Sequence, residues 1–122
     1  MLSEQLRRFI QTNVRTIWAL EVLLLLCRNQ GRLWSPDELN RELRGSVGLV
    51  RDVLSGFQHA GLVKRDAEDR FQWAPSTAEL RQLSQDLVSI YSTRPFSVIK
   101  AITEAQTERI QTLADAFKIK KD

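Results

Sequence analysis

Residues 44–66, RGSVGLVRDVLSGFQHAGLVKRD, change from helical to extended character within a few positions. Apolar side chains recur three and four residues apart, which predicts an amphipathic helix over residues 46–60. Its buried face is predicted to consist of Val47, Val50, Leu54 and Phe57. Gly61 follows at the position where helices commonly end in a left-handed residue. The next letters, LVKRD, are typical of a short strand, so this stretch predicts a helix that leads directly into a β-hairpin.

The sequence on either side supports that prediction. AED and then RFQWAP follow LVKRD, and together they predict two short strands around a charged turn. Leu33 and Trp34 are a candidate third strand. Upstream, SPDEL at residues 35–39 predicts a helix start, because Ser35 can cap the helix while Glu38 reaches back to the Ser35 backbone.

Further helices are predicted at both ends of the chain. Residues 3–12 predict a short amphipathic helix, and residues 14–28 predict a central helix, because their apolar side chains point in every direction and need cover on all sides. STAEL, which begins at Ser76, predicts a second capping box with Glu79. A last helix is expected from Pro95 to about residue 118.

Composition places limits on the class of protein. The chain has 122 residues, of which 43% are hydrophobic and 27% charged, and this is typical of one globular domain. Cys27 is the only cysteine, which excludes an internal disulfide and favours a reducing compartment. No segment reaches the roughly 18 to 20 apolar residues of a membrane span, and the N-terminus lacks the pattern of a signal peptide. We therefore expect a cytoplasmic protein without a membrane segment.

Few residues suggest catalytic or metal chemistry. His59 is the only histidine and has no ligand-type neighbours at metal-binding spacing, so it is predicted to be a surface residue. Asp66, Glu68 and Asp69 share the composition of a calcium loop, but flanking arginines favour a hairpin turn. No phosphate-binding loop, nucleophile elbow or catalytic carboxylate pair is found. We expect no enzyme activity, no metal and no cofactor.

Aromatic side chains leave two interpretations open. They can form the core of the domain, which is the simpler interpretation for a chain of this length, or they can line an effector pocket between the hairpin and the helices. The residues concerned are Trp18, Trp34, Phe57, Phe71 and Trp73.

The predicted order, helix, helix, turn, helix and two-stranded hairpin, resembles the winged helix-turn-helix domain and is most similar to MarR-like bacterial transcriptional regulators. The resemblance is carried by SPDEL at residues 35–39, by the buried side of the helix over residues 46–60, and by AGLVKRD at residues 60–66. It implies a mostly α (α+β) fold with a small β-wing and flanking N- and C-terminal helices.

The resemblance also implies a division of the single domain. Residues 1–13 form an N-terminal helix, residues 14–75 the winged helix-turn-helix core, and residues 76–122 a C-terminal helical extension for dimerisation or partner docking. In that family the helix before the wing enters the major groove of DNA, while the wing approaches phosphates or the minor groove. The implied contact residues are Arg44, Ser46, Gly48, Leu49, Arg51, Asp52 and Ser55 on the helix and Lys64, Arg65 and Arg70 on the wing.

Charge divides the functional prediction into two hypotheses. The whole chain carries a net charge of +3, but residues 33–75 hold six basic and seven acidic side chains. Asp52 departs from the family pattern, because a carboxylate near phosphates is repelled unless it accepts from a cytosine amino group. The first hypothesis is a transcriptional regulator that binds duplex DNA as a dimer. The alternative is a winged helix that docks on a protein, for example one of the transcription machinery, with little or no DNA binding.

The last predicted helix carries an apolar stripe that needs a partner. Six residues fall within about 80° of one another on a helix of 3.6 residues per turn. They are Ile99, Ile102, Gln106, Ile110, Leu113 and Phe117. The expected partner is a second copy of the chain in a homodimer, and the alternative is a groove on a different protein. Gln106, the polar member, is predicted either to be partly exposed or to fix the register of the pair.

Overall fold

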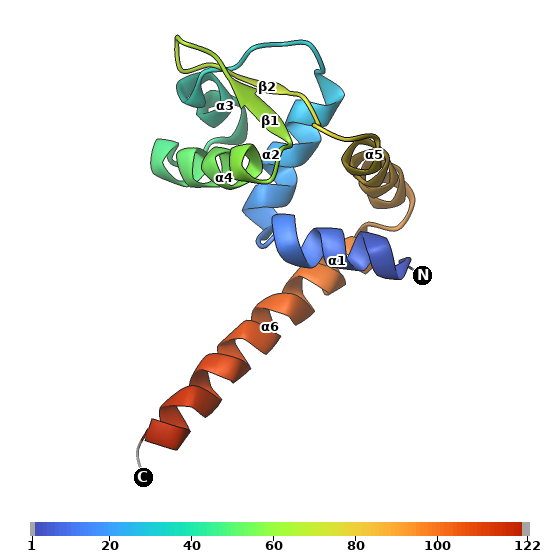
Figure 1. The fold of residues 1–122 in the computed structure, drawn as a ribbon, viewed down its shortest axis with the longest axis vertical. Coiled ribbons are helices and arrows are strands. Elements are labelled where there is room, and N and C mark those ends of the chain that lie inside the picture. The colour runs from blue at the N-terminus through green and yellow to red at the C-terminus, as the bar shows by residue number, and fades with distance from the viewer. Residues whose placement is uncertain (1, 121–122) are drawn as a thin grey trace.

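The computed structural model describes residues 2–120 of the chain, the last three of them by backbone alone. Six helices and two strands follow one another in this part (Figure 1). They are α1 (Glu4–Asn13), α2 (Ile17–Arg28), α3 (Pro36–Leu43), α4 (Val47–His59), β1 (Val63–Arg65), β2 (Phe71–Trp73), α5 (Ala78–Thr93) and α6 (Pro95–Lys120). The predicted fold class, mostly α with a small β component, is confirmed.

Hydroxyl side chains fix where the helices begin. At the first five helices a serine or threonine oxygen accepts a hydrogen bond from the backbone N–H three residues further on, which satisfies one of the free donors of the first turn. The predicted capping box of α3 is confirmed: Glu38 N donates to Ser35 Oγ at 3.1 Å, and Ser35 N donates to Glu38 Oε1 at 2.9 Å.

The predicted cap of α5 is wrong by one residue. Thr77 caps the helix, and its Oγ1 accepts from Leu80 N at 3.1 Å. Ser76 instead belongs to the turn after the hairpin, where its backbone N–H donates to Gly61 O at 2.8 Å. The Ser76 backbone is therefore engaged in joining the hairpin to the end of α4, so the helix starts one residue later.

A sharp bend separates α1 from α2, so the predicted helix over residues 14–28 begins later, at Ile17. The two helix axes meet at 106°. Thr16 caps α2, and Val14 is completely buried in the bend. None of the described helices is long and apolar enough to cross a membrane by itself; α1 and α2 together meet that test on length and composition alone, and the bend at 106° interrupts them.

The hairpin is an antiparallel pair. Val63 lies opposite Trp73, and Arg65 lies opposite Phe71. Trp34 extends the sheet by one bridge, because its backbone exchanges two hydrogen bonds with Phe71, of 2.8 and 2.7 Å. The prediction of a third extended segment is therefore confirmed for Trp34. Gly61 has a φ of 81°, as expected for a left-handed residue at the end of α4.

The core is organised around α2. This helix packs against α3, α4, α5 and β2 (Figure 1), and six of its residues are buried. Its apolar character on all sides follows from that central position. Buried side chains of α4 and the hairpin close the core on one side, among them Leu54, Phe57, Leu62 and Phe71.

The two halves of α6 have different surroundings. The first half packs against α1 and α5, and Val98, Ala101, Ile102 and Ala105 are buried there. The second half projects away from the body (Figure 1). The core of a single chain therefore covers only part of this helix.

Candidate functional site

The outer face of α4 includes Gly48, Leu49, Asp52 and Ser55, which the sequence predicted as contact residues. Gly48, Leu49, Asp52, Ser55, Gly56 and His59 are all exposed. The buried face holds Val50, Leu54 and Phe57, while Val47 is half-buried. Leu49, a large apolar side chain in the first turn of α4, retains 51% of its surface. The surface of α4 is therefore partly apolar.

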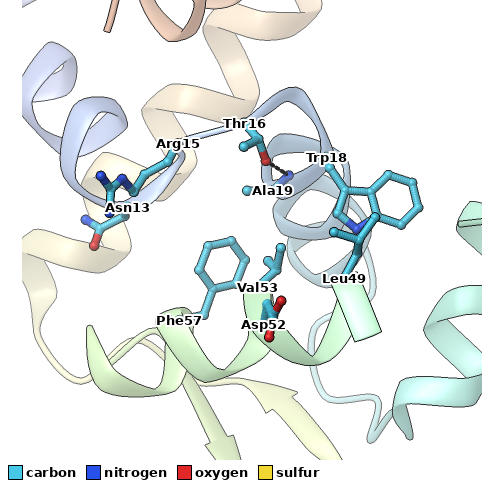
Figure 2. Close-up of a pocket in the computed structure, with 10 residues that line it drawn as sticks. Asn13, Arg15, Thr16, Trp18, Ala19, Leu49, Asp52, Val53 and Phe57 are labelled. Atoms are coloured by element: carbon cyan, nitrogen blue, oxygen red, sulfur yellow. Dashed lines mark hydrogen bonds between the residues drawn. The ribbon is translucent and has the colours of Figure 1, made fainter. Parts of the chain in front are cut away.

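An apolar groove runs along this face, between α4 and the start of α2. Its volume is about 300 Å³. Figure 2 shows Val53 and Phe57 pointing from α4 toward Thr16 and Ala19, with Trp18 beside Leu49 at one end. Asn13 and Arg15 lie at the other end, and Asp52 lines the α4 side. The groove thus combines an apolar floor with one acidic and one basic group.

Trp18 is held in the groove wall by the end of α3. That helix ends at Leu43 and is capped by Arg44, whose φ of 56° makes it a left-handed residue. The next residue, Gly45, lies directly against Trp18: a Cβ at this position would overlap the ring of Trp18. The absence of a side chain at residue 45 therefore lets the indole approach the turn between α3 and α4 closely.

The hairpin carries most of its charge in ion pairs within the chain. Asp69 accepts from two arginines, from Arg51 Nη2 at 2.9 Å and from Arg65 Nε at 2.8 Å. Arg70 pairs with two carboxylates, with Asp66 at 3.0 Å and with Glu68 at 3.2 Å. Three of the predicted contact arginines, Arg51, Arg65 and Arg70, are therefore engaged.

Hydrogen bonds hold the pKa values of two hairpin carboxyls below their usual range. For Asp66 the main cause is the backbone N–H of Arg70, which donates at 2.9 Å. For Asp69 the side-chain hydrogen bond from Arg51 contributes most to lowering the pKa, followed by that from Arg65. Both groups consequently remain negative at neutral pH and keep cancelling the charge of the arginines around them.

The remaining predicted contact residues differ in their availability. Arg44 and Lys64 are exposed and form no ion pair among the residues that the structure describes. Ser46 caps α4, and its Oγ accepts from Leu49 N at 3.1 Å. Gly48 and Ser55 are exposed on the outer face. The structure thus brings the predicted helix and hairpin residues to one side of the molecule. Among their basic side chains, only Arg44 and Lys64 have no ion pair within the described residues.

Sequence reasoning missed the groove. Residues of three separate elements line it, and the contribution of Asn13, Arg15 and Thr16 depends on the bend between α1 and α2, which no local pattern specified. Trp18 and Phe57 both line the groove although they were predicted mainly as core. Phe57 is buried and Trp18 is half-buried, which agrees with the interpretation of the aromatic residues as core. The groove lies between α4 and the bend before α2, so it is not the pocket that the alternative interpretation expected between the hairpin and the helices.

The predicted stripe on α6 needs correction at its first half. Ile102 is fully buried in the core of its own chain and is unavailable to a partner, and Ile99 is half-buried. Gln106 is also half-buried, and its side-chain nitrogen donates to Arg15 O at 3.2 Å. The exposed part of the stripe consists of Ile110, Leu113 and Phe117, with 69%, 59% and 62% of their surface accessible.

The remaining groups to consider are potential metal ligands and the thiol of Cys27. Within residues 2–117 no group of three or more histidine, cysteine or acidic side chains lies close enough together to hold a metal ion. Burial raises the pKa of the Cys27 thiol to about 12, and the nearby Arg28 charge offsets only part of this effect. Cys27 is therefore a thiol at neutral pH and a poor nucleophile.

No model of a known protein family matches the chain, and no curated protein matches it either.

Proposed function

We propose that residues 14–75 form a winged helix-turn-helix domain of a regulator-like protein, and that its α4 face docks on another protein, such as a component of the transcription machinery. The observation that supports this proposal is the apolar groove beside α4, where a DNA-reading helix is usually polar. The order of α2, α3, α4, β1 and β2 agrees with the resemblance noted in the sequence.

Electrostatics favour a protein partner over DNA. Affinity for DNA depends mainly on unpaired basic groups that replace counterions along the phosphates. Residues 64–70 hold three basic and three acidic side chains, and the structure pairs two of the three basic ones with carboxylates of the same hairpin. Two of these carboxyls have lowered pKa values, so they do not release the arginines by protonation at neutral pH.

The groove has the features of a protein docking site. Binding energy at protein interfaces concentrates on apolar and aromatic anchors that fill a pocket. Here Trp18, Leu49 and Phe57 form such a pocket around a volume of about 300 Å³, enough for one large side chain. Asp52 forms no ion pair among the described residues, so a partner with an apolar anchor next to a basic side chain would match the groove in shape and charge.

Duplex DNA is the second candidate, and a specific observation supports it. Arg44 and Lys64 are exposed, and Arg51 lies at the edge of the same face. Surface ion pairs contribute only about 0 to 1 kcal/mol, so phosphates can compete for Arg51. DNA binding through this face would then rest on these three groups and would be weak and strongly dependent on salt.

Binding to mixed duplex DNA across a range of salt concentrations tests the proposal. The docking function predicts little binding even at low salt, and no difference between the wild type and Leu49→Asp. Tight binding that falls steeply with salt and is lost in Arg51→Ala would contradict the proposal and establish the second candidate. Leu33→Asp is a suitable control, because Leu33 is also exposed but does not line the groove.

A further inference from the structure

The projecting half of α6 is a second apolar surface, separate from the groove. A helix of 26 residues is about 39 Å long, and only its first half is covered by the body. Ile110, Leu113 and Phe117 lie within about 60° of one another around the helix axis. All three remain more than half exposed in the single chain.

The projecting half of α6 has an apolar side and a polar, mainly acidic side. Glu104, Glu108, Gln111 and Asp115 lie on the side opposite the apolar residues, at 100° of rotation per residue. Thr107 and Ala114 flank the stripe on one side, and Arg109 and Ala116 flank it on the other. The small residues on the Thr107 side allow two helices to approach closely there, and the absence of acidic residues from the stripe removes repulsion between carboxylates of identical surfaces.

The spacing of the stripe is complementary to itself. In an antiparallel pair that places Phe117 opposite Gln106 of a second copy, Ile110 falls opposite Leu113 of that copy. A twofold axis repeats both contacts, as the interface of a symmetric dimer requires. Each exposed apolar side chain then meets either an apolar side chain or the aliphatic part of Gln106.

The body of the second copy adds to this contact. Gln106 and Arg109 both donate to Arg15 O, at 3.2 and 3.0 Å, which places the bend between α1 and α2 beside this point of α6. The antiparallel register brings the Phe117 end of one copy to the Arg15 region of the other. Such a contribution is needed, because a helix pair of about four turns alone falls short of the roughly 800 Å² per partner of a stable interface.

We propose that a second copy of this chain covers the exposed stripe through an antiparallel α6 pair, with Ile110 opposite Leu113 and Phe117 opposite Gln106. Arg15 lines one end of the groove and also belongs to this contact, whereas Leu49 lies at the far end of the groove, outside the contact, so a substitution at Leu49 changes the groove without changing the α6 pair. The dimer would present two grooves related by twofold symmetry.

The mass of the full chain in solution tests the pairing. At tens of micromolar the wild type is expected at twice its monomer mass of 14.1 kDa, and Leu113→Asp with Phe117→Asp is expected at 14.1 kDa. Gln111→Asp with Thr112→Asp is the matched control, because it adds the same charge to exposed residues outside the stripe and should remain dimeric. Helix content by circular dichroism verifies that each variant is folded. A monomeric wild type, or a folded Leu113→Asp/Phe117→Asp variant that stays dimeric, would overturn the proposal.

Disulfide formation tests the register. A mixture of Ile110→Cys and Leu113→Cys chains should form the mixed disulfide faster than either chain forms a disulfide with itself, because only the mixed pair is directly opposite. The native Cys27 reacts slowly at neutral pH, because burial raises its pKa to about 12. Faster self-linking of Leu113→Cys would indicate a parallel pair and contradict the proposed register. Leu49→Asp should leave both readouts unchanged, which separates failure of this proposal from failure of the docking function.

Discussion

The hairpin and the groove lie beside the same helix, α4. They differ in how many of their charged and apolar side chains already have partners within the chain. In the hairpin, Arg65 and Arg70 pair with carboxylates two to four residues away, and Arg51 of α4 joins them through Asp69. In the groove, Leu49 remains half exposed and Asp52 has no ion pair among the described residues. A surface with an exposed apolar side chain and a carboxylate without an ion pair is the better candidate for contact with a partner. The groove is therefore favoured over the hairpin as the binding site.

Within the groove itself, buried and exposed side chains of α4 have different roles. Phe57 and Leu49 belong to the same helix and both line the groove, but Phe57 is 2% exposed and Leu49 is 51% exposed. One side chain contributes mainly to folding, and the other is available for binding. Substitutions at these two positions should therefore separate stability from function.

Phe57→Ala is expected to have the largest effect on stability. Truncation of a buried phenylalanine costs about 3 to 5 kcal/mol, because it removes apolar burial and leaves a cavity. Leu49→Ala should change the free energy of unfolding by less than about 0.5 kcal/mol, as for most surface positions. Chemical denaturation of both variants measures the difference. Equal losses of stability would show that Leu49 is part of the scaffold and is not a free surface.

Gly45→Ala should destabilise the wall of the groove by about 1 to 3 kcal/mol, because the new methyl group would overlap the Trp18 ring. Gly56→Ala is the matched control. A Cβ at Gly56 meets nothing within 4 Å, so alanine should stabilise α4 by up to about 1 kcal/mol through its higher helix propensity. Thermal melting of both variants gives the sign of each change. A neutral Gly45→Ala would contradict the close approach of Trp18.

Asp69→Asn tests whether paired charge keeps the hairpin from binding DNA. Asparagine suits the left-handed conformation at this position, where φ is 61°, so the turn should be retained. The substitution frees Arg51 and Arg65 from a carboxylate, and we expect weak DNA binding with a salt dependence steeper by about one phosphate contact. Glu42→Gln is the control for net charge, since Glu42 is exposed on α3 outside the hairpin. Equal DNA binding by the two variants would show that only overall charge matters.

The hairpin should keep its turn at moderately acidic pH. The pKa values of Asp66 and Asp69 are lowered in the folded chain, so their contribution to stability is present above the ordinary aspartate pKa of about 3.9 and is lost as pH falls through the lower folded values. The backbone N–H of Arg70, which donates to Asp66, reports this change in an NMR titration. A midpoint at or above pH 3.9 would contradict the hydrogen bonds described for the turn.

Local patterns in the sequence predicted the elements but not the groove. The capping box at Ser35, the left-handed Gly61 and the hairpin depend on neighbouring residues, and all three agree with the structure. The groove requires the bend at 106° between α1 and α2, which depends on packing between distant segments. Burial of Ile102 has a similar cause, because periodicity identifies an apolar stripe but not which part of it the chain covers itself.

Site-specific photo-crosslinking from residue 49 is the most direct test of the docking function. A photoreactive amino acid at Leu49, introduced in the cells that produce the protein, should join the chain to one protein, and the same probe at the exposed Glu79 of α5 should not. Gly56→Glu, which adds a charged side chain at the groove, should abolish that product. The purified partner should then bind the wild type and not Leu49→Asp. Crosslinks from residue 49 to DNA, or the same products from residues 49 and 79, would contradict the account.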